Sequence, residues 1–319
     1  MAMNNQTDLI APHLLTIHTA TYNRAHTLPQ VYQSLKNQTC FDFDWFVTDN
    51  GSTDNTATLF AEWTKEPNSF QIYYHQIPER GIPRALNYGI NHIRGRYFFM
   101  LDSDDELLPN AVEEILKGIQ QVDQMDLYAG VGFVRILPNG QPIKGVWPLT
   151  NSEGYVDCTN LERKKYQLDA DMCEAYKTDI IRRYPFPVWD DEIYAPEQLC
   201  FDRMALDGYL IRWFNKPIYK CEYLEDGQTK GNWNLLRNNK MGYAMLSNLK
   251  IQTEERMKRK YKAAAQHIAL SIVAGHPEYI LQSSKPWISF LAFPYGILLS
   301  FRRRSQFRWD DPVHRRNET

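Results

Sequence analysis

In the first hundred residues of the chain, short apolar runs alternate with segments whose apolar residues recur every three or four positions. The apolar runs, at residues 14–18, 43–48, 71–75 and 97–101, are typical of buried β-strands. The periodic segments predict amphipathic helices with apolar faces formed by Leu28, Val31, Tyr32 and Leu35, then Leu59, Phe60 and Trp63, then Ile82, Ala85, Leu86, Gly89, Ile90 and Ile93. We expect Ser52 or Thr53 to cap the second helix. Because strands that alternate with helices are joined by right-handed crossovers, the pattern predicts an α/β fold, a mainly parallel sheet flanked by helices on both faces.

Polar side chains gather in the loops that follow the first, second and fourth predicted strands. In a parallel sheet, ligands bind beyond the carboxyl ends of the strands, so these loops are expected to meet at one crevice. They span residues 19–24, 49–52 and 102–104. Together they offer a hydroxyl, an aromatic ring, an amide and carboxylates. This set suits a nucleoside diphosphate whose base stacks on Tyr22.

The fourth strand runs directly into Asp102-Ser103-Asp104-Asp105. Two carboxylates one residue apart at the open end of a buried strand can hold a hard divalent cation through oxygen ligands, and that cation can neutralise a diphosphate. Alternatively, Asp102 only ends the strand, and Asp104 or Asp105 caps the helix that follows. The loops around this segment favour the phosphate site.

Several other classes of protein lack support. The chain has neither a Gly-x-Gly-x-x-Gly nor a Gly-x-x-x-x-Gly-Lys-Ser/Thr motif, which argues against nicotinamide enzymes and P-loop ATPases. Its 36 Lys and Arg against 38 Asp and Glu give a net charge of −2, so no nucleic-acid partner is expected. Five scattered cysteines indicate reduced thiols rather than a disulfide framework or zinc site. The polar start, residues 1–8, has no apolar signal-peptide core.

Four motifs, at residues 21–24, 49–54, 81–87 and 101–105, resemble in order and spacing the inverting GT-A glycosyltransferases of family 2. The resemblance implies a GT-A fold, Rossmann-like with a mainly parallel sheet, and a nucleotide-sugar donor, usually a UDP-sugar. It also implies a Mn²⁺ or Mg²⁺ ion that bridges the donor phosphates. Many members carry an Asp where this chain has Asn50, and this departure leaves the identity of the nucleobase open.

The same resemblance assigns roles to individual residues. Thr21, Tyr22 and Asn50 would contact the base, Arg84 the nucleotide, and Asp102 and Asp104 the ribose, diphosphate and metal. The nucleotide-binding residues predicted in this way are Thr21, Tyr22, Asn23, Arg24, Asn50, Arg84, Asp102 and Ser103. Asp104 and Asp102 are the predicted metal ligands, with Asp104 as the direct one. From the residues alone, Asp49 could equally brace its turn, and Arg84 could pair with an acid.

A carboxylate-rich loop at residues 189–197 offers candidates for a catalytic base. Inversion at a sugar carbon needs a group that takes the proton of the acceptor hydroxyl, and a carboxylate can do this. Inverting family 2 enzymes place an acidic base at the start of a helix, about a dozen residues before a glycine and a strand. Glu197, eleven residues before Gly208, fits that position, while Asp191 and Glu192 are competitors. All three could instead belong to a solvated acidic loop.

The rest of the second half is less regular. Residues 127–134 and 217–220 read as strands, residues 138–140 as a turn and residues 173–182 as a mixed helical segment. Relatives close their catalytic domain with stretches similar to residues 221–229, where Asp226 is expected only to form a turn.

Residues past about 230 are predicted to form a helical C-terminal extension with a basic run at residues 256–262. Residues 286–301 are uncharged and precede three arginines, Arg302 to Arg304. This stretch is too short, and too interrupted at residues 294–296, for a typical bilayer span of about twenty residues. An interfacial anchor through residues 286–304 and a helix packed on protein or on a second subunit both remain open.

We therefore expect a GT-A catalytic domain at residues 1–230, with a nucleotide-binding half at 1–125 and an acceptor-side half at 126–230, followed by the extension at 231–319. The expected activity is metal-dependent, inverting transfer of a sugar to a hydroxyl of a glycan or lipid-linked saccharide acceptor. The protein is expected in the cytoplasm, with contact to the inner face of the membrane and formation of a homo-oligomer as open alternatives. A sugar-nucleotide pyrophosphorylase and a non-catalytic scaffold are the rival functions.

Overall fold

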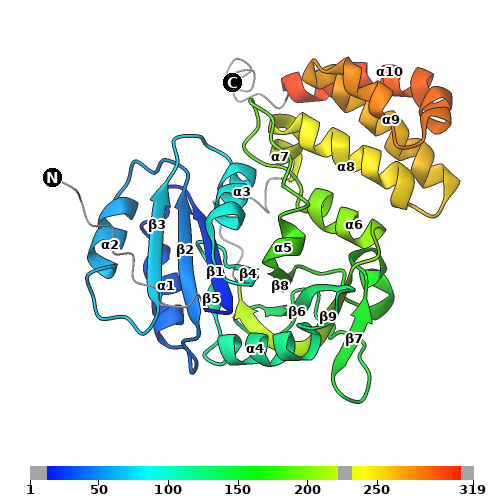
Figure 1. The fold of residues 1–319 in the computed structure, drawn as a ribbon. Coiled ribbons are helices and arrows are strands. Elements are labelled where there is room, and N and C mark those ends of the chain that lie inside the picture. Colours follow the sequence, from blue (N-terminus) through cyan, green and yellow to red (C-terminus); the bar gives the residue numbers. More distant parts are fainter. Residues whose placement is uncertain (1–12, 222–231, 310–319) are drawn as a thin grey trace.

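The computed structural model describes residues 13–221 and 232–309, which form one sheet covered by helices on both faces and a group of helices at the C-terminal end (Figure 1). In the first hundred residues, strands and helices alternate as predicted. They are β1 (Leu15–Thr21), α1 (Leu28–Lys36), β2 (Phe43–Asp49), α2 (Thr56–Trp63), β3 (Gln71–Gln76), α3 (Ile82–His92) and β4 (Tyr97–Met100).

The middle of the chain adds further strands to the same sheet. Its elements are β5 (Glu106–Leu107), α4 (Ala111–Val122), β6 (Tyr128–Ile136), β7 (Tyr155–Cys158), the 3₁₀-helix η1 (Asn160–Tyr166), β8 (Met172–Lys177), α5 (Thr178–Ile181), α6 (Gln198–Leu206) and β9 (Leu210–Lys220). Residues 222–231, which include Asp226, and the polar start at residues 1–8 lie outside the described residues.

The sheet has the strand order β3-β2-β1-β4-β8-β6-β9-β5, with β7 also paired to β9. β3, β2, β1 and β4 all run parallel, which confirms the α/β prediction for this half. β8 then enters antiparallel to both β4 and β6. β6 pairs in parallel with β9, and both β5 and β7 pair antiparallel with β9. The sheet is therefore parallel in its first half and mixed in its second.

The prediction of a mixed helical segment at residues 173–182 is wrong for its first part. Met172–Lys177 is the strand β8, and only Thr178–Ile181 is helical. Five of the six β8 side chains are buried because the strand lies inside the sheet. A strand buried on both faces shows no alternation of polar and apolar residues, so periodicity does not distinguish it from a helix.

The start of α2 also differs from the prediction. Asn55 is the N-cap residue, rather than Ser52 or Thr53. The carboxylate of Asp54 accepts a hydrogen bond from the backbone N–H of Thr56 at 3.0 Å, which satisfies one free donor of the first turn.

The alternative role of the acidic turn as a helix cap is not what the fold uses. β5 separates Asp104 and Asp105 from α4, which begins after Asn110. The two carboxylates therefore do not cap α4.

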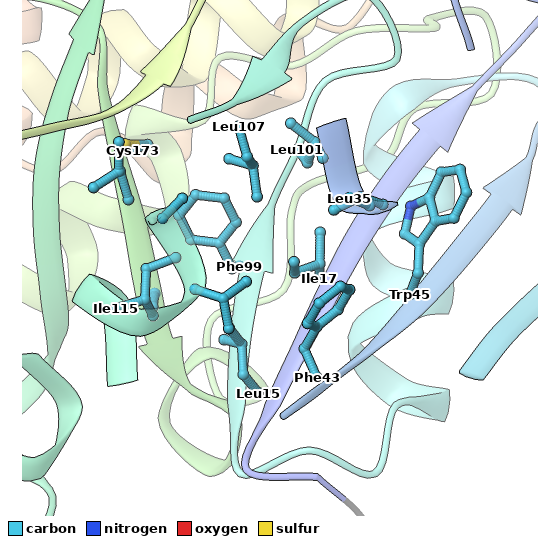
Figure 2. Close-up of a cluster of buried hydrophobic side chains, with 14 of the residues drawn as sticks. Leu15, Ile17, Leu35, Phe43, Trp45, Phe99, Leu101, Leu107, Ile115 and Cys173 are labelled. Carbon is cyan, nitrogen blue, oxygen red and sulfur yellow. The ribbon is translucent and has the colours of Figure 1, made fainter. Parts of the chain in front are cut away.

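Apolar side chains pack on both faces of the sheet, and Figure 2 shows part of the larger cluster. Leu15, Ile17 and Phe99, on the neighbouring strands β1 and β4, belong to the same cluster as Ile115 of α4. The opposite face is covered by α3 and α6 through Leu86, Ile90, Cys200, Phe201 and Met204. Burial on both faces explains why these strands read as continuous apolar runs.

α3 approaches β1 closely where Gly89 faces His18. A Cβ atom at position 89 would lie 2.2 Å from His18 Nε2, so only glycine fits there. The His18 ring is buried, and its Nε2 lies 3.0 Å from Thr48 Oγ1. Burial lowers the pKa of His18 to about 3, so the imidazole is neutral at pH 7.

The C-terminal helices are α7 (Asn232–Asn238), α8 (Lys240–Thr253), α9 (Met257–Ala274), the 3₁₀-helix η3 (Pro277–Gln282) and α10 (Pro286–Trp309). The predicted helical extension is thus confirmed. α8 packs through Leu246 and Leu249 on Ala195, just before α6, and on Leu199 in the first turn of α6. α10 runs without a break through Pro294, contrary to the predicted interruption. None of the described helices is long and apolar enough to span a bilayer.

Candidate functional site

A cavity of about 1010 Å³ lies at the carboxyl ends of β1, β2 and β4. α6 and α8 contribute to its opposite side. Its lining includes most of the predicted site residues, namely Thr21, Tyr22, Arg24, Asn50, Asp102, Ser103, Asp104 and Glu197. Sequence positions up to 176 residues apart, from Thr21 to Glu197, therefore meet in one space.

Asp102 is held from two sides by residues of β6 and β9. Arg135 donates from Nη1 to Asp102 Oδ2 at 2.8 Å, and the hydroxyl of Tyr219 donates to the same oxygen at 3.0 Å. The Arg135 guanidinium also lies 4.1 Å from the centre of the Tyr219 ring. Burial acts to raise the pKa of Asp102, but the charge of Arg135 and these hydrogen bonds outweigh it and lower the pKa below its usual value. Asp102 is therefore an ionised, oriented carboxylate.

Asp104 and Asp105 have different surroundings. Asp104 lines the cavity, and its Oδ2 lies 3.9 Å from Nη2 of Arg24. Asp105 is buried, and its carboxylate lies 3.7 Å from Arg135 Nη1. Burial and the charge of Asp102 raise the pKa of Asp105 to about 8. Asp104 is the carboxylate placed to meet a ligand, whereas Asp105 supports Arg135.

Within the described ranges, no group of three or more His, Cys, Asp or Glu side chains could hold a metal ion. Any cation at Asp102 and Asp104 would need further ligands from a substrate and water. Mg²⁺ is commonly bound in this way, through one or two carboxylates together with phosphate oxygens and waters.

The cavity wall formed by β1 and β2 contains buried polar atoms that have no partner among the described residues. Thr21 Oγ1, Asn50 Oδ1 and His18 Nδ1 make no hydrogen bond to any described residue. All three residues line the cavity. Leaving a buried polar atom unpaired costs about 1–3 kcal/mol, so these three atoms are candidates for hydrogen bonds to a bound ligand.

Tyr22 borders this region with its ring covered on one face. The guanidinium of Arg80 lies 3.9 Å from the ring centre. Because an aromatic ring has two faces, a planar base can still stack on the other.

Asn23, one of the predicted nucleotide contacts, braces the loops in this structure. Its backbone adopts φ +52°, and its Oδ1 accepts from the backbone N–H of Thr53 at 2.8 Å. Its own N–H donates to Ser52 Oγ at 2.8 Å. The hydroxyl of Ser52 in turn donates to Asp49 at 2.6 Å. Asn23 is not among the cavity-lining residues, and Asp49 braces its turn as in the alternative interpretation.

Arg84 on α3, another predicted nucleotide contact, binds the carboxylate-rich loop at residues 189–197. Its guanidinium donates to the carbonyl oxygens of Trp189 and Glu192, both at 2.9 Å. It does not line the cavity. The arginine holds the loop in position, so its geometry does not support a nucleotide contact.

Asp191 and Glu192, the competing candidates for the catalytic base, also lie outside the cavity. The carboxylate of Glu192 is buried and accepts from the backbone N–H groups of Met241 and Gly242, at 2.5 and 2.9 Å. It therefore caps the first turn of α8, where free N–H donors favour an anion. Asp191 is exposed. Neither carboxylate reaches the cavity lining.

Glu197 is the carboxylate of this loop that lines the cavity, at the N-cap position of α6. Burial, followed by the charge of Asp102, raises the pKa of Glu197 to about 7. A carboxylate with a pKa near the working pH can accept and later release a proton.

Several residues that shape the site were missed by the sequence analysis. They are Arg135, Tyr219 and, among the lining residues, His18, Asp171, Tyr243, Ser247, Lys250 and Gln266. The sequence did contain a signal for Arg135, because a charged residue in an otherwise apolar strand is unusual. The residues of α8 and α9 carried no local signal, because only the packing of these helices brings them to the cavity.

Comparisons with known proteins identify the family. A family model described as "Glycosyl transferase family 2" matches residues 16–183, more than half of the chain. Chondroitin synthase from Pasteurella multocida (strain Pm70) is 35% identical over 104 residues, which are 33% of this chain and 11% of that protein. The chain thus matches only about a tenth of this relative.

Two solved structures share the fold. S. aureus TarS 1-349 in complex with UDP-GlcNAc has a TM-score of 0.59 at 16% identity, over 89% of this chain and 80% of that one. The mannosyltransferase PcManGT from Pyrobaculum calidifontis in complex with GDP-Man and Mn²⁺ has a TM-score of 0.51 at 16% identity, over 94% and 84%. The predicted GT-A fold is confirmed, and with the matched family model it follows that the chain belongs to glycosyl transferase family 2.

Proposed function

We propose that the protein transfers a sugar, with inversion, from a nucleotide diphosphate sugar to a hydroxyl of a glycan or lipid-linked saccharide, in a metal-dependent reaction. The observation that carries the proposal is the shared cavity of Asp102, Asp104 and Glu197 with Tyr22 and Asn50. The cavity brings together two aspartates for the diphosphate and its metal ion, a glutamate that can take the proton of the acceptor hydroxyl, and Tyr22 and Asn50 for the nucleobase. A hexosyl or N-acetylhexosaminyl donor is the class we favour, because one solved neighbour holds UDP-GlcNAc.

For the nucleobase, Asn50 Oδ1 has no partner among the described residues and can accept a hydrogen bond from the N–H of a pyrimidine. Thr21 can add a hydroxyl, and Tyr22 a stacking face. These groups favour uracil, although many family members use Asp at position 50. UDP-sugars are therefore the first donors to test.

The metal would be Mn²⁺ or Mg²⁺. Asp102 and Asp104 fit this role because two carboxylates beside a diphosphate site are a donor set that such ions use. When bound, the ion offsets the negative charge that develops on the departing diphosphate. Arg135 contributes by holding Asp102 ionised and in one orientation.

Glu197 is the proposed base. Its carboxylate takes the proton of the acceptor hydroxyl while that oxygen bonds to the anomeric carbon and the bond to the diphosphate breaks on the opposite face. The proton stays on Glu197 until it is released to solvent. With a pKa raised to about 7, Glu197 holds this proton better than an ordinary carboxylate.

The test combines binding with turnover. Isothermal calorimetry with UDP, GDP and their sugars, with and without Mn²⁺, is followed by an assay of donor hydrolysis. We expect UDP-sugars to bind more tightly with Mn²⁺ and to be hydrolysed slowly to UDP and free sugar. Release of sugar 1-phosphate in the presence of pyrophosphate would indicate a pyrophosphorylase, and binding without any turnover would indicate a scaffold.

A further inference from the structure

α10 buries few large apolar side chains, among them Ile288 and Phe307, and presents many more of them to solvent. Its buried side chains include small or polar residues, Ser289, Ala292, Gly296 and Ser300. A Cβ atom at Gly296 would meet Ile268 of α9 at 2.7 Å, so the two helices pack closely on this side. A helix of a globular protein normally buries most of its large apolar residues instead.

Large apolar side chains point away from the protein. We define the α10 apolar face as the residues that are between 42% and 80% exposed, namely Trp287, Phe290, Leu291, Phe293, Tyr295, Leu298 and Phe301. They recur along several turns of the helix and so form a stripe parallel to its axis. A continuous exposed apolar surface of this kind marks an interaction site.

Positive charge borders the α10 apolar face. Residues 284–309 contain no Asp or Glu, and Lys285, Arg302 and Arg304 are exposed at the two ends of the stripe. The ring of Tyr295 stacks on Tyr261 of α9 with centroids 6.1 Å apart. This contact brings the basic first turns of α9, with Lys258 and Lys262, beside α10.

We propose that the α10 apolar face binds an anionic lipid bilayer, with α10 lying in the plane of the interface. Apolar and aromatic side chains would enter the boundary of the acyl chains while the arginines and lysines meet the lipid phosphates. A second copy of the chain fits less well, because two such faces would bring like charges together. The pattern of charge therefore selects the anionic bilayer.

The bound surface would lie close to the cavity. Arg303 of α10 donates to Oε1 of Gln266 at 3.1 Å, and Gln266 lines the cavity. α9 packs against both α10 and α8, and α8 and α9 both carry residues that line the cavity. If the proposed function holds, this arrangement brings a lipid-linked acceptor to the enzyme along the membrane surface.

Co-sedimentation with vesicles tests the surface without any donor or acceptor, so its outcome is independent of the proposed transfer. The full chain is mixed with vesicles of phosphatidylcholine alone or with equal parts of phosphatidylglycerol. We expect binding to the anionic vesicles only. Phe290→Ser/Leu298→Ser/Phe301→Ser should weaken it about tenfold or more, because buried apolar area is lost. Arg302→Gln/Arg304→Gln should weaken it about thirtyfold, as expected for two charges at an anionic surface.

Matched controls change equally exposed residues elsewhere. Leu127→Ser/Leu149→Ser removes side chains that are 56% and 51% exposed, and Lys65→Gln/Lys164→Gln removes two exposed charges. Both should bind like the unchanged protein, and all variants should keep its thermal midpoint. Equal binding of the α10 variants and the controls would overturn the proposal. So would a dimer in analytical ultracentrifugation that the triple variant dissociates, without any vesicle binding, since a second copy would then cover the face.

Discussion

Arg135 and Asp102 form an ion pair, with 2.8 Å between Nη1 and Oδ2, although they lie 33 residues apart in the sequence. The same guanidinium donates from Nε to the carbonyl of Met172 and stacks on the ring of Tyr219. These contacts fix both the charge and the direction of the first carboxylate of the acidic turn.

Arg135→Lys should lower turnover of a UDP-sugar about 10–100-fold, a range typical of residues that orient a metal-binding carboxylate. Lysine keeps the charge but cannot make the planar stack and the two directed hydrogen bonds at once. Steady-state kinetics of donor hydrolysis measure the effect. Arg163→Lys is the matched control, since Arg163 also donates to carbonyls and lies 5.0 Å from a Trp213 ring but does not line the cavity. Equal losses in both variants would contradict a specific role for Arg135.

Asp104→Asn should abolish turnover and remove the gain in nucleotide affinity that Mn²⁺ provides. The amide is nearly isosteric but carries no charge for a divalent cation. Calorimetry with UDP, with and without Mn²⁺, checks the affinity. Asp190→Asn changes a fully exposed carboxylate outside the cavity and should leave both quantities unchanged. Persistence of the Mn²⁺ effect in Asp104→Asn would exclude Asp104 as a ligand.

Glu197→Gln should slow transfer by about 10²–10⁴-fold, which is the usual contribution of a general base to the rate. Donor affinity should stay within about twofold of that of the unchanged protein, because Gln keeps the size and polarity of the side chain. Rapid-quench measurement of product formation and calorimetry of donor binding separate the two quantities. A loss confined to donor affinity would show that the base lies elsewhere.

Glu192→Gln provides the contrast on the same loop. Because Glu192 caps α8, this variant should lose about 1 kcal/mol of stability through the weaker cap. A thermal shift measurement detects this loss. Turnover that falls as far as in Glu197→Gln at unchanged stability would reverse the roles assigned to the two residues.

Asn50→Ala should weaken UDP binding by about 10–100-fold, corresponding to one lost hydrogen bond in a buried site. Binding of pyrophosphate with Mn²⁺ should not change, because that ligand has no base. Competition calorimetry with both ligands makes the comparison within one protein. A parallel loss for pyrophosphate would indicate that the substitution perturbs the whole cavity.

His18 should make the fold sensitive to acid. Its pKa is about 3 in the folded protein against 6.5 for the unperturbed side chain, so below pH 6.5 the unfolded chain binds a proton that the folded chain excludes. Between pH 7 and pH 5 this group removes about 2 kcal/mol of stability. Urea unfolding at both pH values should show that His18→Gln loses less stability over this interval than the unchanged protein. The same pH dependence in both proteins would contradict a buried neutral imidazole.

The first hundred residues were predictable because their signals are local. The apolar runs and helical periods of residues 14–101 gave the correct order of strands and helices, since each element buries its own stripe against the sheet. The acidic turn after β4 was located in the same way. β8 was missed because Met172–Lys177 is buried on both faces and so has no alternation.

By itself, the sequence determined the parallel half of the sheet, the three loops at its edge, and Glu197 as the leading candidate base. Only the tertiary structure decided that Arg135 and Tyr219 hold Asp102, that Arg84 and Glu192 hold the loop and α8, and that α10 turns its apolar stripe outward. The physical reason is distance along the chain. Tyr219 and Asp102 are 117 residues apart, and a contact over such a separation leaves no periodic trace in the sequence.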